Sequence, residues 1–137
     1  MKGYLLDTDM VIQLLRRSPA VWHKLLQAEE KGIPVWLNAL SYYETQRGLL
    51  VSGATAQAQR FEQLCRQLGM VQIDLQVLDK AAEIYAQLFR QGTPIEDADI
   101  LIAAMALVHD LVLVTHNQKH FGRISGIILE DWLSEAQ

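Results

Sequence analysis

The chain has 137 residues, of which half are apolar and a fifth are charged. This length and composition predict a single folded domain over residues 1–137 and exclude an intrinsically disordered chain. The longest unbroken apolar run, residues 100–108, is about half of the ~20 residues that a membrane-spanning helix needs. Asp7 interrupts the apolar stretch at the amino end, so no signal peptide is expected and a cytoplasmic location is favoured.

The charge balance is acidic, with 12 Lys and Arg against 16 Asp and Glu and a net charge of -4. Phosphate binding usually requires a basic excess, which at first argues against a nucleic-acid partner. Net charge, however, says nothing about where the acids lie. The single cysteine, Cys65, excludes an internal disulfide and is compatible with a reducing compartment.

Short apolar runs typical of strands alternate with longer segments of helical periodicity. Strands are predicted at residues 4–6, 34–37, 71–73, 111–114 and 127–129, and helices at 11–15, 19–32, 41–50, 54–68, 77–89 and 94–109. The last helix is expected to open with a capping box over residues 93–96, with Pro94 at its first position. The inward face of the helix at 77–89 is expected to comprise Leu78, Ala81, Ala82, Tyr85 and Leu88. The alternation predicts an α/β fold with a mainly parallel sheet of four to five strands flanked by helices.

In such sheets, ligands bind beyond the carboxyl ends of the strands. Asp7 directly follows the first predicted strand, and Asp9 comes two residues later. Helix N-capping is an equally good interpretation of Asp9, and a weaker one of Asp7 because it lies further from the helix. Glu44 closes Ser41-Tyr42-Tyr43-Glu44, a capping-box pattern, so on its own a structural role is the better interpretation of Glu44.

Three acids, Glu96, Asp97 and Asp99, crowd the start of one helix, where the helix dipole favours them. Residues two apart on a helix point about 200° apart, so Asp97 and Asp99 are not expected to reach one ion together. Asp99 shares its face with the apolar residues of the helix. A carboxylate there costs several kcal/mol unless it is compensated, and a divalent cation is a good compensator.

Asp7, Glu44 and Asp99 come from three separate segments that a parallel sheet would bring to one edge. Three oxygen ligands without an accompanying Cys or His set favour a hard ion, Mg²⁺ or Mn²⁺. Such an ion polarises a phosphate and activates a bound water. The sequence therefore predicts a carboxylate metal site acting on phosphate esters.

Four short motifs, in this order and at this spacing, make the chain resemble the PIN-domain ribonucleases, specifically the VapC-like toxins of bacterial toxin–antitoxin pairs. They are Leu5-Leu6-Asp7-Thr8-Asp9, Ser41-Tyr42-Tyr43-Glu44 with Gly48, Asp99-Ile100-Leu101-Ile102-Ala103-Ala104, and Val114-Thr115-His116-Asn117 with Phe121. The resemblance extends from Tyr4 to about Trp132 and implies a three-layer PIN-like fold.

The resemblance also implies an Mg²⁺- or Mn²⁺-dependent endoribonuclease, often a homodimer, that a separately encoded antitoxin protein holds inactive. It places Asp7, Glu44 and Asp99 on the family's core carboxylates and Asn117 where many members have a fourth acid. Because Asn is neutral, a second metal is in question. Supporting roles are implied for Thr8 and Thr115, while Asp97 and Asp9 are secondary candidates.

Three basic residues, Arg47, Lys119 and Arg123, are candidates for binding flanking RNA phosphates, although solvated surface charge is the better interpretation of any one of them. His116 and His120 have a spacing that suits zinc only on a helix, and no Cys or third His lies beside them in the sequence. A structural role is therefore favoured for both, although His116 is a candidate for touching substrate.

Two alternatives belong to other functional classes. The first is a haloacid-dehalogenase-like aspartyl-phosphate phosphatase with Asp7 as nucleophile, disfavoured because no downstream Lys or Gly-Asp motif is evident. The second is a PIN-like module that binds RNA or regulates without strong catalysis, for which Asn117 leaves room.

If Asp7, Glu44, Asp97 and Asp99 line the crevice, the remaining acids equal the bases in number. The acidic excess then indicates a metal site, and RNA binding should depend on the metal.

Overall fold

All five strands of the sheet run parallel, in the order β3-β2-β1-β4-β5. The computed structural model describes residues 2–133, and none of the helices in that range is long and apolar enough to span a membrane. The strands are β1 (Tyr4–Leu6), β2 (Val35–Asn38), β3 (Gly69–Val71), β4 (Val112–Val114) and β5 (Leu129–Glu130). The predicted fold class is confirmed.

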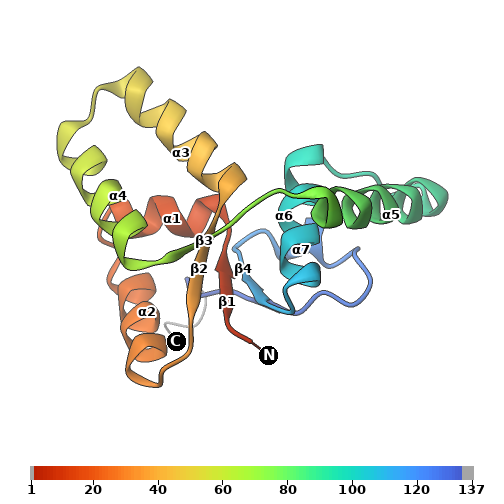
Figure 1. Cartoon of the computed structure of the whole chain (residues 1–137), viewed down its shortest axis with the longest axis horizontal. Coiled ribbons are helices and arrows are strands. Elements are labelled where there is room, and N and C mark those ends of the chain that lie inside the picture. The colour runs from red at the N-terminus through yellow and green to blue at the C-terminus, as the bar shows by residue number, and fades with distance from the viewer. Residues whose placement is uncertain (1, 134–137) are drawn as a thin grey trace.

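Helices cover both faces of the sheet, as Figure 1 shows with the sheet near its centre. One layer contains α1 (Thr8–Leu15), α2 (Pro19–Glu30), α3 (Ala39–Ser52) and α4 (Thr55–Gln67). The other contains α5 (Leu75–Gln91), α6 (Asp97–Val108) and the short α7 (Gln118–Phe121). Successive strand residues point to opposite faces, so Leu5 joins the core under α5 and α6 while Leu6 joins the core under α1, α2 and α4.

The inward face predicted for α5 is partly wrong. Ala81 and Leu88 are buried as expected, but Leu78 and Tyr85 are 47% and 52% exposed, and Ala82 is exposed as well. The helix carries two apolar stripes, and the one that packs against α6 comprises Val77, Ala81, Ile84 and Leu88. Spacing shows that both stripes exist, but the choice between them depends on how the helix is rotated toward its neighbour.

The capping box predicted before α6 is also wrong. Gly92 ends α5 in the left-handed conformation, and the backbone N–H of Thr93 donates to the Leu88 carbonyl at 3.0 Å. Thr93 therefore completes the end of α5. Pro94 lies in the connecting loop, and α6 begins only at Asp97.

Two further helix starts differ from the predictions. Asp7, not Asp9, is the N-cap of α1, and its side chain accepts a hydrogen bond from the Thr8 backbone N–H at 2.8 Å. Asn38 caps α3 by accepting from the Ser41 backbone N–H at 2.8 Å, so Ser41 is no cap and Glu44 lies beyond the first turn. Both helices begin earlier than their apolar periodicity because the strands run directly into them.

Candidate active site

The candidate site lies at the carboxyl edge of the three central strands. Asp7 follows β1, Asn38 ends β2, and Thr115 follows β4. Because β1 pairs with β2 on one side and β4 on the other, these three positions are neighbours at one edge. The chain winds in opposite directions on the two sides of β1, which is the arrangement that opens a binding crevice in parallel α/β sheets.

Asp7 is the most buried carboxylate of the site, with 7% of its surface exposed. Its Oδ1 accepts from the Thr8 backbone N–H at 2.8 Å, and its Oδ2 accepts from the Thr115 hydroxyl at 2.7 Å. Burial raises the pKa of Asp7 to about 7, with further increases from the charges of Asp9 and Asp99, although both hydrogen bonds oppose the rise. The protein groups around Asp7 therefore favour its neutral form over its charged form.

Glu44 reaches the same edge from α3 and is held by a residue of α1. The Thr8 hydroxyl donates to Glu44 Oε1 at 2.7 Å, and the same oxygen of Thr8 lies 2.7 Å from the Ser41 hydroxyl. Glu44 is only partly buried. The capping role that the local pattern on its own favoured for Glu44 is wrong, because its side chain contacts α1 and not the start of its own helix. The assignment of Glu44 as a metal ligand stays a prediction.

Asp99 completes the acidic set from the first turn of α6, with 22% of its side chain exposed. Burial raises the pKa of Asp99, and the charges of Glu96 and Glu44 add to the rise, while the imidazole of His120 opposes it. Asp99 in turn raises the pKa of Asp7. The charge of Glu44 thus acts on Asp99 and that of Asp99 acts on Asp7, while the shared metal site of the three acids stays a prediction.

The donor chemistry of this set fits a hard divalent cation, because it consists of carboxylate oxygens with an uncompensated charge. Among residues 2–133, however, no three His, Cys, Asp or Glu side chains converge closely enough to bind one ion directly. Mg²⁺ usually keeps several of its waters, so a binding mode with water between some carboxylates and the ion suits this spacing.

Thr115 and Asn117 lie beside the carboxylates, after β4. The Thr115 side chain is fully buried, donates to Asp7 and accepts from the Asn117 backbone N–H at 3.0 Å. The Asn117 side-chain amide lies 3.0 Å from Nδ1 of His120, and that nitrogen is 3.7 Å from Oδ2 of Asp99. His120, interpreted from the sequence as structural, therefore borders the site.

Asp9, whose charge acts on Asp7, is hydrogen-bonded to His116 in the segment after β4. Oδ2 of Asp9 accepts from the His116 backbone N–H at 3.0 Å, and His116 Nδ1 lies 2.8 Å from Oδ2 of Asp131. Oδ1 of Asp9 is buried without a hydrogen-bond partner among the described residues. Burial raises the pKa of Asp9, although the N–H bonds it accepts from His116 and Met10 lower it.

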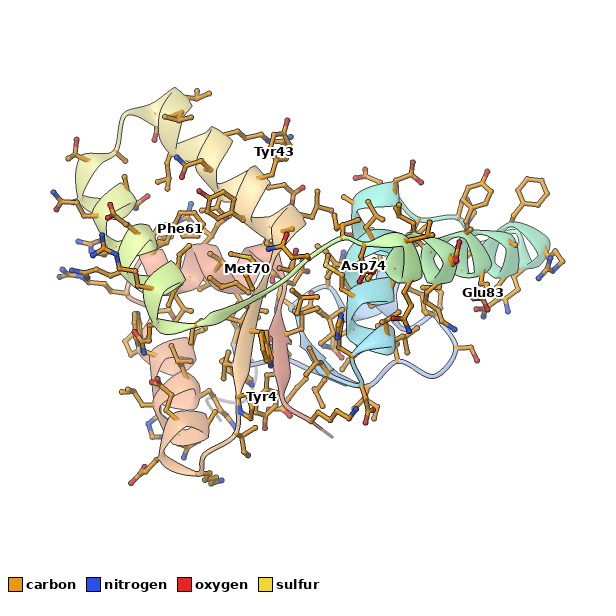
Figure 2. All side chains as sticks on the ribbon, viewed as in Figure 1. Tyr4, Tyr43, Phe61, Met70, Asp74 and Glu83 are labelled. Carbon is orange, nitrogen blue, oxygen red and sulfur yellow. The ribbon has the colours of Figure 1, made fainter. Side chains whose placement is uncertain are left out.

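The remaining candidates lie at the rim. Asp97 is exposed at the first position of α6, separate from the inward side of Asp99. Arg47 is exposed on α3 with its guanidinium 5.1 Å from the centroid of the Tyr43 ring, which projects outward from that helix in Figure 2. Lys119 is exposed, whereas Arg123 donates to the Pro94 carbonyl at 3.1 Å beside the start of α6.

The sequence did not single out Asn38 as a site residue, and it favoured a structural role for His120. Asn38 is fully buried at the end of β2, where the rule that ligands bind beyond strand ends would have drawn attention to it. His120 carries no such signal, because its proximity to Asp99 depends on how α7 packs against α6.

Comparison with known proteins agrees with this geometry. The family model described as "PIN domain" matches residues 4–127. "Ribonuclease VapC1" of Haemophilus influenzae (strain R2866) is 30% identical, covering 94% of this chain and 97% of that protein. "tRNA(fMet)-specific endonuclease VapC" of Shigella flexneri is 29% identical, covering 96% and 99%.

Among solved structures, the DNA-bound VapBC complex from Salmonella typhimurium includes a chain that superposes with a TM-score of 0.87 at 28% identity. The superposition covers 96% of this chain and 99% of that one. The family-model match runs through all four motifs and through strands β1 to β4. The chain belongs to the PIN-domain family.

Proposed function

We propose that the chain is a metal-dependent endoribonuclease that acts as the toxin of a toxin–antitoxin pair. The observation that carries this proposal is the arrangement of three acids at the carboxyl edge of the sheet: Asp7 after β1, held by the Thr115 hydroxyl, Glu44 on α3, held by the Thr8 hydroxyl, and Asp99 in the first turn of α6. Full-length relatives carry the names ribonuclease and endonuclease. They support nuclease activity over the phosphatase alternative.

Asp7, Glu44 and Asp99 would hold Mg²⁺ or Mn²⁺, directly or through its waters. When bound, the ion would supply a water activated for attack on a phosphodiester and positive charge beside the phosphate. The Thr115 hydroxyl donates to the Asp7 carboxylate and accepts from the backbone N–H of Asn117. The side chain of Asn117 is a neutral amide at the same edge. This amide adds no charge to the acidic set, which favours one metal over two.

Substrate binding would involve the basic residues at the rim. Arg47 on α3 and Lys119 on α7 are both exposed. Arg123 is tied to the loop before α6 and so has less freedom to reach a phosphate. RNA phosphates would meet these side chains while the metal offsets the acids between them.

Partners follow from the related structures, which are VapBC toxin–antitoxin complexes. We propose that a cognate antitoxin covers the site, that two copies of the chain associate, and that the pair acts in the cytoplasm, where its RNA substrate lies.

The test is RNA cleavage by the purified chain, freed of antitoxin, with total tRNA and a structured messenger RNA as substrates. Cleavage is expected with Mg²⁺ or Mn²⁺ and is expected to stop with excess EDTA. Asp7→Asn and Asp99→Asn should lower kcat at least 100-fold, whereas the exposed Asp97→Asn, with the same charge change, should stay within threefold. Cleavage that persists in EDTA or in both inactive variants would overturn the proposal.

A further inference from the structure

Glu44 is connected to a buried asparagine by an unbroken chain of hydrogen bonds. Nδ2 of Asn38 lies 2.9 Å from Oγ of Ser41, which lies 2.7 Å from Oγ1 of Thr8, which donates to Glu44 Oε1 at 2.7 Å. Asn38 and Ser41 are 0% and 1% exposed. The chain of bonds joins α3 to α1 through the interior of the fold, beneath the site.

The orientation of the Asn38 amide is fixed by its surroundings. Its Oδ1 accepts from the Ser41 backbone N–H at 2.8 Å, and its Nδ2 donates to the Leu6 carbonyl at 2.9 Å. In a flipped amide, the NH₂ group would face the Ser41 N–H, which is also a donor, and the amide oxygen would face the Leu6 carbonyl, which is also an acceptor. Only the observed orientation therefore satisfies both groups. The second proton of Nδ2 is therefore the one that Ser41 Oγ accepts.

The two hydroxyl protons follow in turn. A carboxylate only accepts, so the Thr8 proton is donated to Glu44. Because the one hydroxyl proton of Thr8 is donated to Glu44, the Ser41 hydroxyl must be the donor in its bond with the Thr8 oxygen. Every bond of the chain points from Asn38 toward Glu44, an order in which neighbouring bonds strengthen one another.

We propose that Asn38, Ser41 and Thr8 are positioning residues that hold the Glu44 carboxylate ready for the metal. This inference rests on the proposed function, in which Glu44 is a metal ligand. The chain of bonds uses Oε1, and among residues 2–133 no hydrogen bond to Oε2 is present, which leaves that oxygen for the ion or its waters. Because Asn38 is anchored on Leu6, the residue before Asp7, the chain also fixes the distance between two of the three carboxylates.

The experiment compares Thr8→Val, which keeps the shape but removes the hydroxyl, with Thr8→Ser, which keeps the hydroxyl. Mn²⁺ binding is measured by calorimetry on the full chain without RNA, alongside kcat and KM for cleavage. Thr8→Val should weaken Mn²⁺ binding about 10- to 100-fold and lower kcat with little change in KM. Thr8→Ser should restore both to within threefold, which a general packing role would not predict.

A second variant distinguishes the loss of these hydrogen bonds from a general effect on folding. Ser41→Ala interrupts the chain one step earlier, and the Thr8→Val/Ser41→Ala double variant should bind Mn²⁺ no more weakly than Thr8→Val alone, because both act through Glu44. Each variant is checked for a native circular-dichroism spectrum and a cooperative thermal transition. Additive losses in the double variant would contradict a single chain of bonds.

The outcomes separate this inference from the proposed function. If Thr8→Val folds and retains wild-type Mn²⁺ affinity and kcat, the positioning role is wrong. If Glu44→Gln leaves Mn²⁺ binding unchanged, the inference is also overturned, whatever happens to RNA. If the wild type binds Mn²⁺ through Glu44 and Thr8 but cleaves no RNA, the positioning role holds and the ribonuclease proposal fails.

Discussion

The Thr115 hydroxyl donates to Asp7 Oδ2 at 2.7 Å and joins residues 108 positions apart in the sequence. The bond ties the carboxyl end of β4 to that of β1, and the same hydroxyl oxygen accepts the Asn117 backbone N–H. One fully buried side chain therefore supports the most buried acid of the site and orients the segment that carries Asn117.

Thr115→Val tests this relationship, because it removes the hydroxyl while keeping a branched side chain of similar size. It leaves the Asn117 N–H without its acceptor and Asp7 with one donor fewer, which should lower the free energy of unfolding by about 1–3 kcal/mol. We also expect kcat for RNA cleavage to fall at least tenfold. Urea denaturation followed by circular dichroism measures the first effect and initial cleavage rates the second.

Thr115→Ser is the matched control, since it keeps the hydroxyl and loses only a methyl group. Its stability should stay within about 1 kcal/mol of the wild type, and most of its activity should remain. Equal losses for the Val and Ser variants would show that the methyl group, and not the hydrogen bond, is what matters at this position.

His120 makes the second testable contact, since its Nδ1 lies between Asn117 and Asp99. His120→Ala frees the Asn117 amide and removes a neighbour of Asp99, so we expect kcat/KM to fall about 10-fold, as for other residues that orient metal ligands. His109→Ala, at the opposite end of α6, should stay within twofold. Equal activity in the two variants would show that His120 has no role in the site.

The sequence predicted the parallel sheet and the acidic edge because both depend on local signals, namely short apolar runs and acids directly after them. Asp7 was identified in this way, whereas Asp99 was identified by its position on the apolar face of its helix. In the structure, Asp7 follows β1 and Asp99 lies in the first turn of α6. Their exact role as metal ligands stays a prediction.

The sequence did not predict the contacts between segments that lie far apart in the chain. Ser41 and Glu44 match a capping box, yet the actual cap is Asn38 and both side chains turn to Thr8 on another helix. A capping pattern describes one helix end, whereas these bonds arise from how α3 packs against α1. The wrong choice of Leu78 and Tyr85 as buried has a similar origin, because helix rotation is set by the partner helix.

Gly69 offers a prediction about the fold itself. A Cβ at this position would lie 2.4 Å from the Trp36 ring, so the edge strand β3 passes directly over the indole of β2. Gly69→Ala should therefore destabilise the chain by about 1–3 kcal/mol in urea denaturation. Gly48→Ala, on α3 with nothing within 4 Å of its Cβ, should stabilise it by about 0.5–1 kcal/mol. A neutral Gly69→Ala would show that Trp36 can move aside freely.

The raised pKa of Asp7 predicts how stability depends on pH without metal. In the folded chain the pKa rises from 3.8 to about 7, chiefly through burial, so the folded state holds this proton more tightly than the unfolded state does. The contribution of protonated Asp7 to the free energy of unfolding is fully present below about pH 4. It is lost as the pH rises to 7, which lowers the free energy of unfolding by up to about 4 kcal/mol. The raised pKa values of Asp9 and Asp99 act in the same direction.

Asp7→Asn removes this cost, because the amide cannot ionise. In EDTA at pH 8, we expect Asp7→Asn to raise the free energy of unfolding by about 1–3 kcal/mol, with little or no gain near pH 4. Asp97→Asn, an exposed acid with the same change in charge, should alter stability by less than about 0.5 kcal/mol at either pH. Urea denaturation of the three proteins at both pH values makes the measurement. A gain for Asp7→Asn that is equal at the two pH values would mean that charge burial is not its cause, whereas a gain confined to the higher pH would show that the site is strained by the charge that a metal would neutralise.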